Sequence, residues 1–97
     1  LILLSIMSRF CYIMVNLQDA GVSLIQSLEV LEEIFGNSYL TSKFRSMKKD
    51  IAEGKGLGES FERTQIFPPI IVQMVSIGEQ SGRLTEMLLS VAEFFEK

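Results

Sequence analysis

Histidine is absent from this sequence and cysteine occurs only once, so two residue types that often carry chemistry are missing or isolated. Histidine is the side chain that most often acts as a general base and binds metals. The single Cys11 excludes a disulfide framework, and its apolar surroundings predict a buried free thiol. Because no nucleophile is paired with a base either, the sequence argues against an enzyme and calls for no cofactor or metal.

Charge is also limited. The net charge of −3 offers no electrostatic case for binding nucleic acid. The apolar fraction of 47% and the charged fraction of 22% are typical of a globular chain and argue against disorder. A length of 97 residues suffices for one modest helical core, so we predict a single domain over residues 1–97.

A membrane-spanning run is missing as well. Such a span needs about 20 mostly apolar residues. The apolar N-terminal segment, residues 1–15, is interrupted by Ser5, Ser8 and Arg9. An arginine near its middle would cost roughly 2.5–3.5 kcal/mol on membrane-insertion scales. No basic segment precedes it, as a secretory signal would require, so we expect a soluble, packed helix here.

Proline is scarce, and the only two prolines stand together as Pro68-Pro69. Proline is well tolerated in the first turn of a helix. From Ile70 to Ile77 six of eight residues are apolar, and they are spread most of the way round a helix. A short helix of this kind is expected to be buried on most sides. We therefore predict a central helix that begins at the prolines and ends at Gly82.

Five further helices are predicted from apolar residues that recur at three- and four-residue steps. They are expected at about residues 3–19, 23–35, 39–53, 57–64 and 84–96. Gly21 and Gly36 mark helix ends, and Ser23 followed by Gln26 predicts a capping box. The predicted fold is all-α: an antiparallel bundle of six helices, two of them short, around a central apolar helix.

The central stretch also carries a resemblance to a known family. Phe67-Pro68, an apolar run and the segment G-E-Q-S-G-R-L at residues 78–84 resemble the F-P…G-E-x-S-G-x-L signature of the type II secretion F domain. Upstream, Phe10 and the segment at residues 17–24 resemble the opening of the same domain. Together these matches extend from about Phe10 to Phe95.

The resemblance implies a cytoplasmic scaffold domain of a bacterial inner-membrane platform protein that serves type II secretion or type IV pilus biogenesis. Such domains bind the assembly ATPase and inner-membrane assembly proteins and perform no chemistry. The resemblance further implies a fragment of a longer membrane-spanning protein, at the cytoplasmic face of the inner membrane, in which two copies could pair as a homodimer. The residues alone leave another interpretation open, a stand-alone soluble helical adaptor or regulator.

The first group of candidate site residues is a fold-defining motif: Pro68, Gly78, Glu79, Gly82 and Leu84. Gly78 is expected to allow close approach of helices, and Gly82 to supply a turn. A carboxylate among apolar residues must be hydrogen-bonded or paired. We expect Glu79 to bind the backbone around residues 81–84 or Arg83, with a direct grip on a partner as the alternative.

The second group consists of candidate partner contacts: Arg45, Lys48, Lys49, Leu89 and Glu93. The three cations project together from the helix expected at residues 39–53. They are compatible with a solvated face, with an acidic partner surface or with the anionic cytoplasmic leaflet. Leu89 falls outside the apolar stripe of the last helix, and Glu93 shares its side.

Acidic residues gather on the helix expected at residues 23–35, where Glu29, Glu32 and Glu33 face outward. A hard cation needs several converging oxygens, and nothing in these spacings resembles a calcium loop. We therefore expect solvated glutamates and no metal site.

Overall fold

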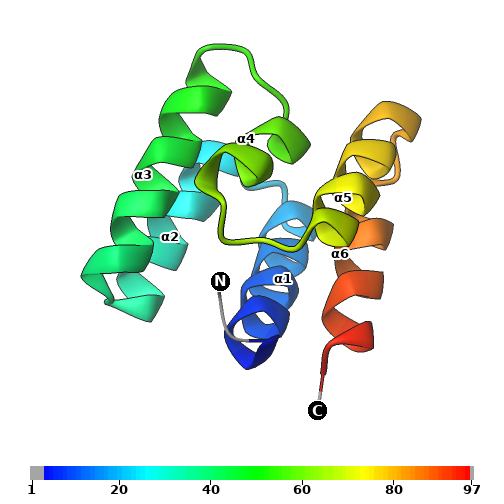
Figure 1. Cartoon of the computed structure of the whole chain (residues 1–97), viewed down its shortest axis with the longest axis horizontal. Coiled ribbons are helices and arrows are strands. Elements are labelled where there is room, and N and C mark those ends of the chain that lie inside the picture. Colours follow the sequence, from blue (N-terminus) through cyan, green and yellow to red (C-terminus); the bar gives the residue numbers. More distant parts are fainter. Residues whose placement is uncertain (1–3, 97) are drawn as a thin grey trace.

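The computed structural model describes residues 4–96, and these residues form six α-helices and no strand (Figure 1). The helices are α1 (Leu4–Asp19), α2 (Leu24–Phe35), α3 (Ser38–Ala52), α4 (Leu57–Thr64), α5 (Pro69–Ser81) and α6 (Leu84–Phe94). The predicted all-α class and the number of helices are confirmed. The predicted helix ends lie within two residues of the observed ones, and the expected start at residue 3 falls outside the described part.

The helix ends coincide with residues that satisfy free backbone groups. The Ser23 hydroxyl accepts the backbone N–H three residues on, at 3.2 Å, and the Asn37 side chain does the same for α3 at 3.0 Å. α2 and α5 end at Gly36 and Gly82, with φ values of +54° and +74°. Only glycine enters this left-handed region without a steric penalty, so these turns have a local cause in the sequence.

α1 lies in the middle of the molecule, between the α2/α3 pair and the α5/α6 pair (Figure 1). Phe10 at its centre is fully buried. Its ring centroid lies 5.4, 5.8 and 5.7 Å from those of Phe44, Phe61 and Phe67. Tilted and edge-on aromatic pairs at such separations are favourable. The core is therefore built around α1, which brings α3, α4 and the segment before α5 together.

The predicted packing of the N-terminal apolar run is confirmed over α1. Met7 and Met14 are fully buried beside Phe10, and the buried Ser8 hydroxyl donates to the Ala92 carbonyl of α6 at 2.8 Å. Arg9 is exposed. Within residues 4–96, no helix combines the length and the hydropathy needed to cross a bilayer.

α5 is not the central helix that its composition predicted. Each described helix lies beside two others, and the neighbours of α5 are α4 and α6, so burial decides which helix is central. Its buried side consists of Ile71, Val75 and Gly78, whereas Ile70 and Ile77 are 54% and 47% exposed. The prediction was wrong because an all-round apolar helix indicates how much apolar surface could be buried, and not how much of that surface the fold covers. One apolar face of α5 consequently remains uncovered.

Candidate functional site

Glu79 on α5 ties the start of α4 to α5. One of its carboxylate oxygens accepts the backbone N–H of Gly58 at 2.9 Å, and the other accepts the N–H of Leu57. α4 begins after Gly56, which has no side chain to cap the helix. The Glu79 carboxylate therefore takes the place of a local cap, and its negative charge also suits a helix N-terminus.

The partner predicted for Glu79 was wrong. The carboxylate is hydrogen-bonded to backbone, but to residues 57 and 58 rather than to the turn after α5. Arg83, the other predicted partner, instead pairs with Glu86 at 3.0 Å. The helical pattern predicted a bonded carboxylate correctly, but it could not show which backbone, some twenty residues away in the chain, would come to lie beside it.

Two glycines let α5 approach both of its neighbours. A Cβ added at Gly58 would lie 3.0 Å from the Cα of Ser76 and 2.1 Å from its Oγ. A Cβ added at Gly78 would lie 2.9 Å from the Cγ of Met87 and 3.1 Å from the Cα of Leu84. Both contacts therefore require glycine. The close approach expected at Gly78 joins α5 to α6, and the one at Gly58, joining α5 to α4, was missed in the sequence.

Of the remaining motif residues, Pro68 and Gly82 form the two ends of α5, and Leu84 begins α6. Pro68 is the N-cap, and Pro69 is the first helical residue. After Gly82 the chain turns tightly, because the Arg83 N–H donates to the Gly78 carbonyl at 2.8 Å. Leu84 then starts α6 against the Gly78 backbone. The five motif residues thus lie along α5, at its two caps and at the start of α6, and they set how α4, α5 and α6 meet.

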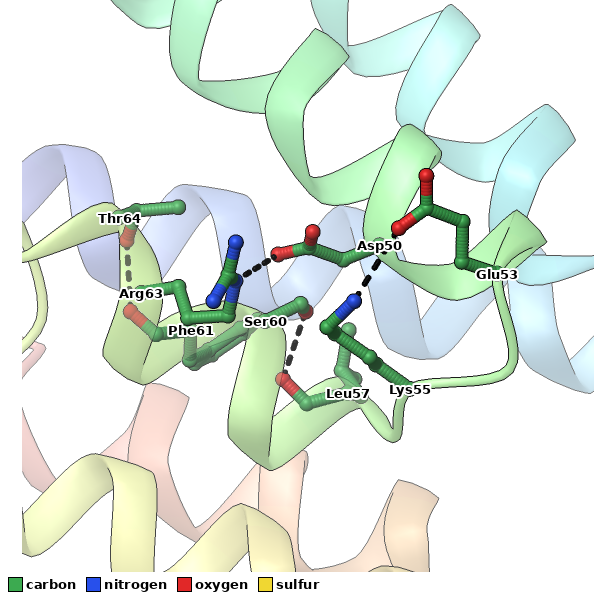
Figure 2. Close-up of polar contacts among 8 residues, drawn as sticks. All are labelled: Asp50, Glu53, Lys55, Leu57, Ser60, Phe61, Arg63 and Thr64. Carbon is green, nitrogen blue, oxygen red and sulfur yellow. Dashed lines mark hydrogen bonds and ion pairs between the residues drawn. The ribbon is translucent and has the colours of Figure 1, made fainter.

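A second polar link joins α3 to α4 (Figure 2). Figure 2 shows Asp50 of α3 and Arg63 of α4 pointing toward each other, with 2.9 Å between Oδ2 and Nε. Asp50 is only 3% exposed, so its carboxylate needs such a partner. The sequence analysis missed this residue, and the only available signal was its place three residues after the buried Met47.

Arg45 and Lys48 turn toward α2. The Lys48 Nζ lies 2.6 Å from Glu32 Oε2 and 3.9 Å from Glu29 Oε2, and the Arg45 Nε lies 3.3 Å from Glu32 Oε1. Burial by itself opposes ionisation of Glu32, but Lys48 and Arg45 outweigh it, so the pKa of Glu32 is lowered. The expectation of solvated glutamates is therefore wrong for Glu32, whose side chain is 13% exposed.

The three predicted basic contacts consequently do not form one free patch. Lys49 is exposed and makes no ion pair within residues 4–96, whereas the charges of Arg45 and Lys48 are largely offset inside the domain. Leu89 and Glu93, the two contacts expected on the last helix, both lie exposed on α6. Their role in binding a partner stays a prediction.

An apolar groove lies between α5 and α6. It has a volume of about 330 Å³ and is lined by Ile70, Met74, Ser90, Phe94 and Phe95. Phe94 is 73% exposed. The groove is the uncovered face of α5 extended onto α6, and no sequence prediction placed a site there.

The described residues hold no arrangement that points to bond-breaking chemistry. No group of three or more His, Cys, Asp or Glu side chains within residues 4–96 could hold a metal ion. Burial raises the pKa of the Cys11 thiol to about 12, so it stays protonated at neutral pH and is a poor nucleophile.

A sequence model of the family described as "Type II secretion system (T2SS), protein F" matches residues 10–97. This chain belongs to that family. Within the F-P and G-E-x-S-G-x-L residues on which the resemblance depended, Glu79 caps α4 and Gly78 makes the close contact of α5 with α6. Pro68 and Gly82 of the same signature stand at the two ends of α5. In this chain, residues of the protein F family signature therefore determine how α4, α5 and α6 pack together.

Two relatives from Pseudomonas aeruginosa carry names from different assembly systems. The chain is 33% identical over 93 residues to a type IV pilus assembly protein PilC and 32% identical over 85 residues to a type II secretion system protein F. These matches cover 96% and 88% of the chain, but only 25% and 21% of the relatives. A PilC protein of Thermus thermophilus is 32% identical over 91 residues, which are 93% of this chain and 22% of that protein.

The chain therefore spans about a quarter or less of the length of these protein F relatives. Homology to non-enzymatic platform proteins confirms the prediction that the chain is not an enzyme.

Proposed function

We propose that this protein F domain is a docking scaffold on the cytoplasmic side of a bacterial inner-membrane platform, where it binds the assembly ATPase and inner-membrane assembly proteins. The family match over residues 10–97 is the observation that carries the proposal. The relatives named for type IV pilus assembly and for type II secretion support a role in such machinery, without favouring one system over the other.

The polar contacts between helices suit a scaffold that transmits the movement of a bound partner. Glu79 fastens α4 to α5, and the Asp50–Arg63 pair fastens α4 to α3. Around them the core side chains of all six helices are buried. Close-packed interiors deform little and transmit strain. A push from an ATPase on one face would therefore move the domain as a rigid body.

The domain would be one part of a longer membrane-spanning protein. Relatives about four times as long as the matched region support this proposal. Pairing of two such domains as a homodimer belongs to the same proposal. The stand-alone adaptor remains the competing interpretation, and the gene sequence on either side of this segment decides between them: hydrophobic spans of about 20 residues support the platform.

A binding experiment tests the docking role directly. The purified domain is immobilised, and the assembly ATPase of the same organism is applied at rising concentrations, with Lys49→Glu as the key variant because Lys49 is exposed and unpaired within the described residues. We expect weaker ATPase binding. Arg9→Glu, a charge reversal at another exposed cation without an ion pair within the described residues, is the matched control and should bind as the parent chain does.

Two outcomes would count against this proposal in different ways. Equal binding by Lys49→Glu would remove Lys49 as a contact with the ATPase. No ATPase binding by the parent chain would contradict the docking role itself.

A further inference from the structure

A further pocket lies between the end of α4 and the start of α5. It has a volume of about 400 Å³ and is lined by Glu62, Phe67, Pro69, Val72 and Gln73. This volume is within the range of binding pockets, roughly 300–1,000 Å³. The α4–α5 pocket is separate from the apolar groove, which is lined by other residues of α5 and by the end of α6.

The apolar part of this pocket is held in place by the aromatic core. Phe67 is 5% exposed, and its ring stacks on that of Phe61 with 3.9 Å between the centroids. The ring of Phe10 lies 5.7 Å from it. Pro69 and Val72 complete this part, and the ring of proline and the branched Cβ of valine leave both side chains little freedom. A ligand would therefore meet a formed surface, and little entropy would be lost in ordering it.

The rim of the pocket is negatively charged. Glu62 is exposed and forms no ion pair within residues 4–96. Glu59, three residues earlier and therefore on the same side of α4, is also exposed and unpaired in that part of the chain. Arg63, the one cation of α4, points instead to Asp50 of α3 (Figure 2). α5 contains no lysine or arginine, so nothing on either helix offsets the two carboxylates.

The helix ends beside the pocket do not reverse this sign. α4 ends at Thr64 and α5 begins at Pro69, so the negative end of one helix dipole and the positive end of the other both lie there. Each is equivalent to about half an elementary charge, and the two partial charges largely offset each other. Glu62 carries a full charge, which makes the pocket suitable for a cation.

We propose that the α4–α5 pocket binds an arginine side chain of a partner protein. The planar guanidinium group can donate two parallel hydrogen bonds to the Glu62 carboxylate, and the carbonyl oxygen of the Gln73 amide can accept a third. The apolar stem of the arginine would then pack on Val72 and Pro69. Lysine is a compact, strongly hydrated charge and lacks the flat group that makes paired hydrogen bonds.

Charge complementarity argues for this occupant, since opposite charges across an interface steer association and exclude wrong partners. An anionic membrane surface would be repelled by Glu59 and Glu62. An uncharged apolar segment would cover Glu62 without giving it a partner. The inference rests on the proposed docking function and names the chemistry of the partner that this pocket would recognise.

A nuclear magnetic resonance titration of the whole isotope-labelled chain tests the pocket directly. The probes are three capped alanine pentapeptides with arginine, citrulline or lysine at the centre; citrulline has nearly the shape of arginine but no charge. We expect the amide signals of Glu62, Val72 and Gln73 to shift. The Kd of the arginine peptide should be about tenfold lower than that of the citrulline peptide and about threefold lower than that of the lysine peptide.

Three variants locate the binding. Glu62→Gln should abolish the preference for arginine over citrulline. Glu33→Gln, at an exposed glutamate of α2, is the charge-matched control and should leave every Kd unchanged. Glu59→Gln should weaken the arginine peptide by about twofold at most, because Glu59 is near the pocket but is not among its lining residues. Since all three side chains are exposed, the thermal midpoints should match that of the parent chain.

Several outcomes would overturn the inference. Equal Kd values for the arginine and citrulline peptides, or a preference that survives Glu62→Gln, would show that the pocket does not choose a guanidinium group. Equal losses for Glu59→Gln and Glu62→Gln would reduce the effect to a general attraction between charges. A dimer that is seen in sedimentation and lost in Glu62→Gln would make a second copy of this chain the occupant.

Failure of this inference is distinguishable from failure of the docking function. If no peptide binds the pocket and the parent chain still binds the ATPase, the inference is wrong and the docking role stands. If the arginine peptide binds as expected and the ATPase does not, the pocket inference stands and the ATPase is the wrong partner.

Discussion

The Glu79 cap of α4 can be tested by removing the carboxylate. Glu79→Ala would leave the N–H groups of Leu57 and Gly58 without an acceptor, and both residues are buried. A buried donor left unpaired costs about 1–3 kcal/mol, and a lost N-cap costs about 0.5–2 kcal/mol. Since water can reach the half-buried Glu79 site, we expect a loss of about 2–3 kcal/mol in the free energy of unfolding.

A second substitution makes this test specific. A Cβ at Gly56 would lie 2.9 Å from Glu79 Oε1, so Gly56→Ser should destabilise the parent chain. With Glu79→Ala the obstacle is gone, and the serine hydroxyl can cap α4 locally. Gly56→Ser should therefore recover about 1 kcal/mol in the Glu79→Ala background.

The assay is urea unfolding of the four chains of this cycle, followed by circular dichroism, with Gln80→Ala as a control at an exposed neighbouring site. Hydrogen exchange at the Leu57 and Gly58 amides should accelerate only when the cap is absent. A loss below about 0.5 kcal/mol for Glu79→Ala, or the same effect of Gly56→Ser in both backgrounds, would refute the proposed cap.

Three further predictions concern packing, pH and thiol reactivity. Gly58→Ala should cost about 1–3 kcal/mol in urea unfolding, because its Cβ would overlap the Ser76 backbone and hydroxyl; an unchanged midpoint would contradict that close contact. Because the pKa of Glu32 is lowered in the folded state, its carboxylate stabilises the fold at pH values above its ordinary pKa of 4.5. This stability should be lost as the pH falls through the folded-state pKa. Lys48→Met should flatten the pH dependence of unfolding on the acid side of pH 4.5, and an unaltered slope would contradict the ion pair. Cys11, with a pKa raised to about 12, should react with Ellman's reagent at pH 8 only as fast as the domain opens, so rapid labelling of the folded chain would show that it is not buried.

The two groups of candidate residues differ in how much of their structural role could be predicted from the sequence. Gly82 and Pro68 act on the backbone next to them, so their positions at the two ends of α5 could be predicted. Lys48 looked like a solvent-facing cation, because nothing on its own helix indicates that Glu32 lies 2.6 Å away on α2. A face of like charges on one helix is therefore a weak prediction of a free surface.

The sequence by itself determined where helices begin and end, that they are amphipathic, and to which family the chain belongs. Those properties depend on neighbours within one or two turns: caps such as Ser23, left-handed glycines such as Gly36 and the apolar period. Only the tertiary structure decided that α1 rather than α5 is central, that Glu79 caps α4 and that Asp50 is buried against Arg63. These outcomes depend on which helix faces meet in space. The sequence around a side chain does not indicate which distant residue will pack against it.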